Sequence, residues 1–269
     1  MVPILPGVLS IILYLAASSL LVLRLARGGA LFSCRRRQIL TISAGAVFIH
    51  AAFLYPLVVQ PNGLNLGFFY AASLITLTTA LLLALADLFQ PVDNLGIVVF
   101  PIAALSIGLL LAYPDERLIT DASSWQLDIH ILLSLLAYSI LGLAVVQAIL
   151  LAIQDRHLHN RQPGGFIRAL PPLAVMETLL FQMIGVGFVL LTLALVTGAL
   201  FLEDIFAQHL VHKTTLSIVA WIVFAILLWG RWRFGWRGRT AIRWTIGGFI
   251  FLMLAYLGSK FVLELILRR

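Results

Sequence analysis

The sequence has little charge and almost no cysteine. Charged residues make up 11% of its 269 residues and apolar residues 62%, whereas a soluble domain has roughly a quarter charged and half apolar residues. These proportions, together with a mean hydropathy of +1.06, exclude a soluble globular protein and a disordered chain. The single cysteine, Cys34, excludes an intrachain disulfide and any CxxC redox or zinc motif. What remains is a polytopic membrane protein.

The sequence also lacks the local motifs of common catalytic sites. It contains no Walker loop, no GxSxG, no HExxH and no GxGxxG that follows a strand. No cluster of carboxylates joins its histidines with the spacing of a zinc site. We therefore expect no enzymatic activity.

Long apolar runs predict the fold class, an all-α bundle of membrane helices. A membrane helix needs about 20 mainly apolar residues, and eight such runs are separated by turn-forming segments. We expect a single membrane domain over residues 1–269, because no loop is long enough for a soluble domain. The predicted spans are Val2–Ala26, Ile39–Val59, Leu66–Leu88, Asn94–Tyr113, Leu127–Ile153, Glu177–Leu202, His212–Gly230 and Thr240–Ile266.

Small and aromatic residues add two expectations about these spans. The glycine pairs Gly185 with Gly187 and Gly247 with Gly248 indicate close helix contacts. Most of the tryptophans lie near span ends, which is typical of the aromatic belts at membrane interfaces.

The basic residues predict the orientation of the chain. The formal charge is +7, and most Lys and Arg residues fall on loops one, three, five and seven. The positive-inside rule places these loops in the cytoplasm and both termini on the outer, periplasmic side of a bacterial inner membrane. We interpret the charge mainly as a topology signal, with an anionic ligand or partner as the alternative, and expect no nucleic-acid partner. The arginines of these loops are Arg24, Arg27, Arg35, Arg36, Arg37, Arg156, Arg161, Arg168, Arg231, Arg233, Arg237, Arg239 and Arg243.

Four histidines in or beside the spans are candidate ligands. His50 lies near the middle of the second span, His130 just inside the outer end of the fifth, and His209 and His212 beside the seventh. Ionisable residues at membrane depth mark functional sites, and imidazole is a common ligand of metals and heme iron. The alternatives are a hydrogen bond to a neighbouring helix for His50 or His130, and a solvated loop for the other two. Because a helix rises about 1.5 Å per residue, His130 pairs more easily with His209 or His212 than with His50.

Four segments carry a family resemblance. Two lie near the C-terminus, GFVLLTLALVTGALF (187–201) and GWRGRTAIRWTIGGFIFLMLAYLGSKFV (235–262), and two lie earlier, LNLGFFYAASLITL (64–77) and SSWQLDIHILLSLLAYS (123–139). In this order and spacing, over about residues 40–265, they resemble the cytochrome c assembly protein family of CcsA-like heme-handling proteins. The short length is similar to the YpjD/HemX-like branch of that family.

The resemblance implies a function. It implies a protein that binds or passes heme b without covalent chemistry of its own. Its partners would be heme, the lipid bilayer and other cytochrome c maturation or membrane proteins. His130 matches a heme-ligating histidine of the family, and the second iron ligand would be His212, His209 or His50.

Four further residues would complete such a heme site. Trp125 and Tyr138 would line the porphyrin. Arg117 and Lys213 would pair with the propionates, because Arg and Lys suit carboxylates.

The sequence also departs from the family pattern. The loop that is rich in tryptophan in the family corresponds here to LEDIFAQHLVHKTTLS (202–217), which has none. The family histidine before the GWRG turn is replaced by Trp229 or Gly230. These departures favour an alternative function, a heme-free regulatory or scaffolding subunit that acts through a partner at its arginine-rich loops. A small-solute transporter is a weaker alternative, because no inverted repeat is visible.

Overall fold

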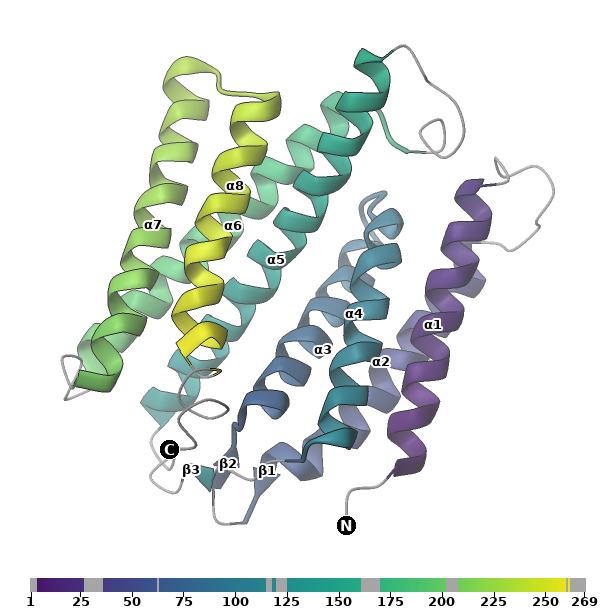
Figure 1. Ribbon diagram of the computed structural model, residues 1–269, viewed down its shortest axis with the longest axis vertical. Helices are drawn as coiled ribbons and strands as arrows, with labels where there is room; N and C mark the ends of the chain where they lie inside the picture. The colour runs from purple at the N-terminus through teal and green to yellow at the C-terminus, as the bar shows by residue number, and fades with distance from the viewer. Residues whose placement is uncertain are drawn as a thin grey trace. The chain divides into compact units, whose positions relative to one another are not determined.

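The computed structural model describes residues 4–26, 36–61, 63–114, 118–119, 125–160, 170–201, 208–259 and 261. This part of the chain is almost entirely helical (Figure 1). Its α-helices are α1 (Ile4–Ala26), α2 (Arg36–Val58), α3 (Phe68–Ala86), α4 (Gly96–Ala112), α5 (Trp125–His159), α6 (Leu173–Phe201), α7 (Gln208–Phe234) and α8 (Gly238–Met253). A 3₁₀ turn (Asp93–Leu95) precedes α4, and a π-helical segment (Leu254–Gly258) continues α8.

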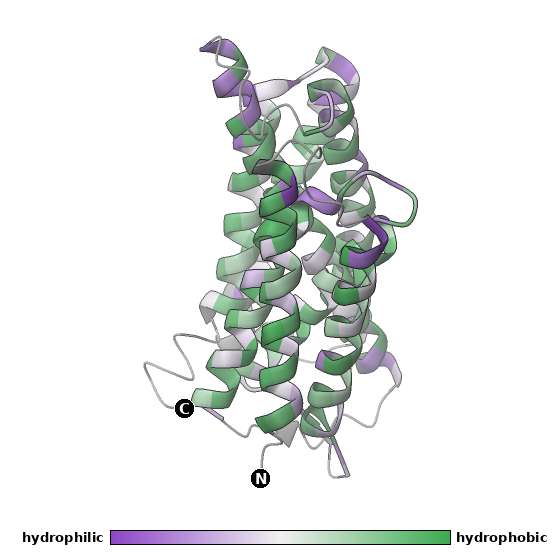
Figure 2. Cartoon of the chain, turned by 90° about the vertical axis from the view of Figure 1, so that its right-hand side faces the viewer, coloured by the Kyte–Doolittle hydropathy of each residue, from purple (hydrophilic) through white to green (hydrophobic). Residues whose placement is uncertain are grey.

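Each of the eight predicted spans is confirmed as a helix long and apolar enough to cross a membrane. The helices are hydrophobic along most of their length, and hydrophilic residues gather towards their ends (Figure 2). Many large apolar side chains are exposed on these helices, among them Leu5, Phe48 and Leu105. Such residues are suited to lipid rather than water, so the fold is a polytopic all-α membrane protein.

Helix ends are where the structure departs from the predicted boundaries. The fifth span was expected to end at Ile153, but α5 continues to His159 through the polar segment QDRHLH. The seventh was expected to begin at His212, but α7 begins at Gln208. Polar residues extend both helices beyond the apolar run, and hydropathy alone does not register such extensions.

Three short strands link the α2–α3 connection, which contains β1 and β2, with the α4–α5 connection, which contains β3. β1 (Val59–Gln60) pairs antiparallel with β2 (Gly63–Asn65), and β2 pairs antiparallel with β3 (Leu118–Ile119). Gly63, the first residue of β2, adopts a φ of 136°, which strongly favours glycine. The sequence had predicted a turn here but no strands.

The chain divides into two compact units, which are described separately. Unit 1 comprises Met1–Ile119 and Gln154–Leu173, and unit 2 comprises Thr120–Ile153 and Ala174–Arg269. In unit 1, α1 packs against α2 and α4, and α3 packs against the same two helices. The single domain expected from the sequence stays a prediction.

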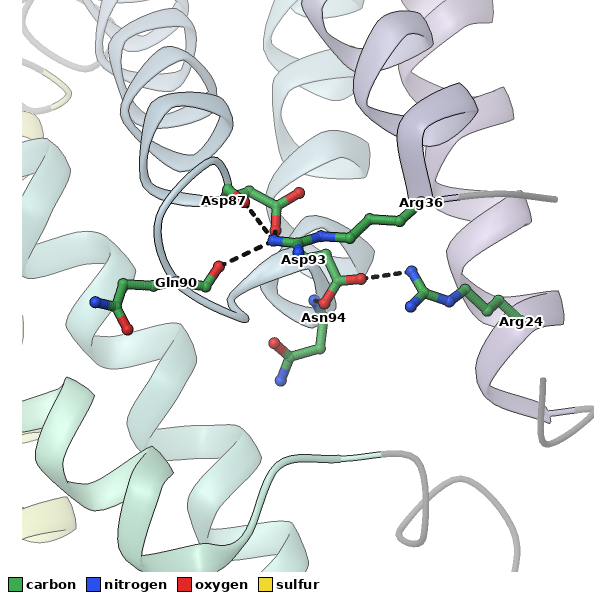
Figure 3. Close-up of polar contacts among 6 residues, drawn as sticks. All are labelled: Arg24, Arg36, Asp87, Gln90, Asp93 and Asn94. Atoms are coloured by element: carbon green, nitrogen blue, oxygen red, sulfur yellow. Dashed lines mark hydrogen bonds and ion pairs between the residues drawn. The ribbon is translucent and has the colours of Figure 1, made fainter.

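Two ion pairs hold the connection between α3 and α4 in unit 1 (Figure 3). Arg24 of α1 lies 2.6 Å from Asp93, and Arg36 at the start of α2 lies 2.8 Å from Asp87. Arg36 also donates to the backbone carbonyls of Asp87 and Gln90. Burial raises the pKa of the Asp87 carboxyl, and the hydrogen bond from Arg36 opposes that rise. Arg24 and Arg36, which the sequence analysis used to predict orientation, thus also hold the connection between α3 and α4 in place.

Close contacts through glycine organise unit 2. A Cβ at Gly187 of α6 would lie 2.6 Å from Leu141 of α5, and one at Gly248 of α8 would lie 2.9 Å from Phe224 of α7. A Cβ added at Gly185 or Gly247 would have no neighbouring atom within 4 Å. One member of each predicted glycine pair therefore makes the close contact, because neighbouring glycines point to different sides of a helix.

The two glycines of α8 provide a matched test of this packing. We expect Gly248→Ala to lower the free energy of unfolding by about 1–3 kcal/mol, because the added methyl group overpacks the contact with Phe224. Gly247→Ala should leave it unchanged or raise it, since alanine is the better helix former. Thermal unfolding in mild detergent measures both. Equal effects of the two substitutions would contradict the packing described.

Candidate functional site

His130 lies in the second turn of α5 and faces α6. Its Nδ1 is 3.0 Å from the carbonyl oxygen of Ala194 and 3.3 Å from Oγ1 of Thr197. The Thr197 hydroxyl donates its own proton to the carbonyls of Leu193 and Ala194, at 2.9 and 3.0 Å. Both groups that face Nδ1 therefore act as acceptors.

This arrangement assigns the tautomer of His130. Because Nδ1 faces acceptors, it must carry the proton, and a neutral imidazole then keeps a lone pair on Nε2. Nε2 makes no hydrogen bond to another described residue. Histidines that bind metals are commonly oriented in this way, with the second ring nitrogen donating to a backbone carbonyl.

Gly198 of α6 allows the ring to sit against that helix. A Cβ at this position would lie 2.9 Å from Cε1 of His130 and 3.3 Å from Nδ1. Any larger residue would displace the imidazole from the Ala194 carbonyl. Sequence reasoning missed Ala194, Thr197 and Gly198 as site residues, although all three lie in the 187–201 segment that carries the family resemblance.

His50 occupies a different environment, in the interior of unit 1. Its Nδ1 is 3.3 Å from the Tyr14 hydroxyl, and its Nε2 is 2.9 Å from Oγ of Ser73. The side chain is fully buried. Because both ring nitrogens are engaged, His50 forms a hydrogen-bond network between α1, α2 and α3, the alternative the sequence left open. An iron atom could bind it only after one hydrogen bond breaks.

Tyr138 is buried two turns after His130 on α5. Its hydroxyl donates to the carbonyl of Leu252, just before the π-helical segment, and its ring packs edge-on against Phe249 and Tyr256. The wider π turn disturbs the regular helical hydrogen bonds, and the tyrosine hydroxyl satisfies one of the carbonyls there. These contacts give Tyr138 a packing role between α5 and α8.

The other predicted site residues are only partly described. Trp125 is the first residue of α5 and is exposed, and Lys213 is a half-exposed residue of α7. His209 and His212 belong to the first two turns of α7 rather than to a loop, but their side chains lie outside the described residues, as does all of Arg117. Among the described side chains, no other predicted site residue forms a hydrogen bond with His130.

No group of three or more His, Cys, Asp or Glu side chains with metal-binding geometry occurs within the described part of the chain. A single oriented imidazole such as that of His130 could nevertheless help to hold a heme, because the porphyrin itself supplies most of the ligands of the iron.

Comparison with known proteins identifies the family. A family model described as Cytochrome C assembly protein matches residues 38–267, close to the region of resemblance predicted at about 40–265. The chain belongs to the cytochrome c assembly protein family.

Individual relatives agree with this assignment. The chain is 32% identical to the inner membrane protein YpjD of Escherichia coli (strain K12) over 233 residues, 86% of this chain and 88% of the relative. It is 27% identical to the cytochrome c biogenesis protein CcsA of Prochlorococcus marinus (strain MIT 9515), over 64% of each chain. No solved structure matches the chain. The eight spans and these relationships confirm the predicted location, a multi-pass protein of the inner membrane.

The His50 network gives a test of its structural role. His50→Leu would leave the Tyr14 and Ser73 hydroxyls buried without their partner, so we expect the free energy of unfolding to fall by roughly 1–3 kcal/mol. Phe48→Leu on the lipid-exposed side of α2 is the control and should have little effect. Thermal unfolding in detergent measures both. A His50→Leu protein as stable as the unsubstituted one would refute the structural assignment.

Proposed function

We propose that this family member binds heme and passes it on during cytochrome c assembly, with Nε2 of His130 as one axial ligand. Two observations support the proposal. The family supplies the context of cytochrome c assembly, and the tautomer of His130 leaves the Nε2 lone pair available. The Ala194 carbonyl and Gly198 hold the ring in one orientation, so the ligand is oriented before heme arrives.

The heme would be b-type, held without covalent attachment. The chain has a single cysteine, so it lacks the paired cysteines that attach heme covalently in c-type cytochromes. When bound, the heme supplies an iron that accepts axial nitrogen ligands. The role of the protein is to bind and orient this cargo, and we propose no covalent chemistry.

Candidates for the second ligand come from α7 and α2. His212 and His209 are favoured over His50, because His50 already uses both of its nitrogens. Trp125, exposed at the start of α5, would cover the porphyrin, and Lys213 and Arg117 would pair with the propionates. Of these, Lys213 lies on the same helix as the two favoured histidines.

A heme-free regulatory or scaffolding subunit is the second candidate function. It is favoured by the absence of tryptophan from residues 202–217 and by the arginine-rich turn between α7 and α8. In this alternative, other membrane proteins of cytochrome c maturation would be the partners.

An absorbance spectrum separates the two candidates. The purified protein, with hemin added and then reduced with dithionite, should show a Soret band and sharp α/β bands. His130→Ala should abolish or strongly alter these bands, because it removes the axial nitrogen. His157→Ala, a substitution near the C-terminal end of the same helix, is the matched control and should leave them unchanged. A spectrum unaltered in His130→Ala would overturn the assignment, and the absence of any band would favour the heme-free alternative.

A further inference from the structure

The Thr197 hydroxyl contacts His130 from a helix that offers the hydroxyl two backbone acceptors. Its Oγ1 lies 2.9 Å from the carbonyl oxygen of Leu193 and 3.0 Å from that of Ala194, as is common for threonine in a helix. The hydroxyl has a single proton, and donating it to either carbonyl leaves Oγ1 free to accept. Oγ1 then acts as an acceptor towards Nδ1 of His130, which lies 3.3 Å away.

The Ala194 carbonyl is shared among several donors. In an α-helix it accepts the backbone N–H of the residue four positions later, which is Gly198. It also lies 3.0 Å from Nδ1 of His130 and 3.0 Å from Oγ1 of Thr197. A carbonyl oxygen has two lone pairs, so these donors are best satisfied when Thr197 donates to Leu193 instead. Thr197 and Ala194 then share the Nδ1 proton as joint acceptors.

Close packing of α5 against α6 holds Thr197 and His130 together. A Cβ at Gly198 would lie 2.9 Å from Cε1 of His130, and a Cβ at Gly187 would lie 2.6 Å from Leu141. His130 and Leu141 are about three turns apart on α5, as Gly198 and Gly187 are on α6. The imidazole therefore cannot move along α6 unless the contact between Leu141 and Gly187 also breaks.

Hydrogen bonds from Nδ1 determine how strong a ligand Nε2 is. An acceptor at one ring nitrogen raises the basicity of the other nitrogen, and second-shell hydrogen bonds of this kind tune the reduction potential of a heme iron. A more basic imidazole stabilises Fe3+ more than Fe2+, because Fe3+ carries the larger charge. A second acceptor at Nδ1 therefore favours ferric heme.

We propose that Thr197 is a positioning residue of the His130 site, and that its hydroxyl makes the site prefer ferric over ferrous heme more strongly than the Ala194 carbonyl alone would. This inference rests on the proposed heme function. It adds to that function the oxidation state in which the cargo is held, and it assigns that preference to a single side chain.

Heme titrations in both oxidation states test the role of Thr197. The full-length protein in mild detergent is titrated with hemin and with dithionite-reduced heme, and the reduction potential of the loaded protein is measured. Thr197→Val removes the hydroxyl and nearly keeps the shape of the side chain. We expect the ratio of ferric to ferrous affinity to fall roughly tenfold, as is typical for loss of an outer-shell partner. That change raises the reduction potential by about 59 mV.

Matched variants separate the contact with His130 from the loss of a helix hydroxyl. The Thr178 hydroxyl of α6 makes the same kind of bond, to the carbonyl of Ala174 at 2.9 Å, and lies about five turns from Thr197. Thr178→Val should therefore leave both affinities and the potential unchanged. Thr197→Ser keeps the hydroxyl and should keep the potential of the unsubstituted protein. Thr197→Ala is a second variant without the hydroxyl, which covers the case in which Thr197→Val does not fold.

The outcomes distinguish this inference from the proposed function. The absence of heme bands, or bands that persist unaltered in His130→Ala, would overturn both. Bands that depend on His130, with a potential that neither Thr197→Val nor Thr197→Ala changes, would overturn the role of Thr197 alone. An equal shift in Thr178→Val would also overturn that role, because the effect would not come from contact with Nδ1.

Discussion

Polar groups within the membrane-spanning helices must find partners inside the protein, because the hydrocarbon offers no water to replace them. Most polar side chains of the described helices follow this constraint, although Oε1 of Gln147 in α5 is buried without a partner among the described residues. Tyr14, His50 and Ser73 bond to one another, and Nε1 of Trp221 donates to Thr192 at 2.8 Å. Each such contact joins two helices, so the few polar side chains help to set which faces pack together.

The same constraint distinguishes the two described membrane histidines. His50 has a partner at each ring nitrogen and thus serves the packing of unit 1. Among the described residues, His130 has hydrogen-bond acceptors only at Nδ1, and one of them is a backbone carbonyl of α6 that no side-chain substitution removes. Its Nε2 has no partner among the described residues, and the heme proposal assigns a ligand to that nitrogen. The packing of α5 against α6 determines where the ring lies.

Much of the fold could be predicted from the sequence, because a membrane span leaves a long apolar run. The eight spans are of this kind. Their ends were less certain, since the last turns of α5 and the first of α7 are polar. The π-helical segment after α8 was not predicted, and the hydrogen bond just before it, from Tyr138 to the carbonyl of Leu252, joins residues more than a hundred positions apart.

The candidate site was only partly predictable. The histidines stood out as rare polar residues in apolar runs, but sequence cannot show which nitrogen of a histidine is bonded. The His130 ring contacts Ala194, Thr197 and Gly198 of α6. These residue types are common in any membrane helix, and only the packing of α6 on α5 gives them their role. The pairing of Arg36 with Asp87 was likewise hidden, because both residues were interpretable as ordinary loop charges.

Solid-state nitrogen NMR of histidine-labelled protein in a lipid bilayer tests the central claim most directly. His130 is assigned by the resonances lost in His130→Ala, and gallium protoporphyrin is added as a diamagnetic heme analogue. We predict a proton on Nδ1, an unprotonated Nε2, and a shift of the Nε2 resonance on addition, while the His50 resonances stay in place. A proton on Nε2, or an Nε2 resonance unaffected by the porphyrin, would contradict the account.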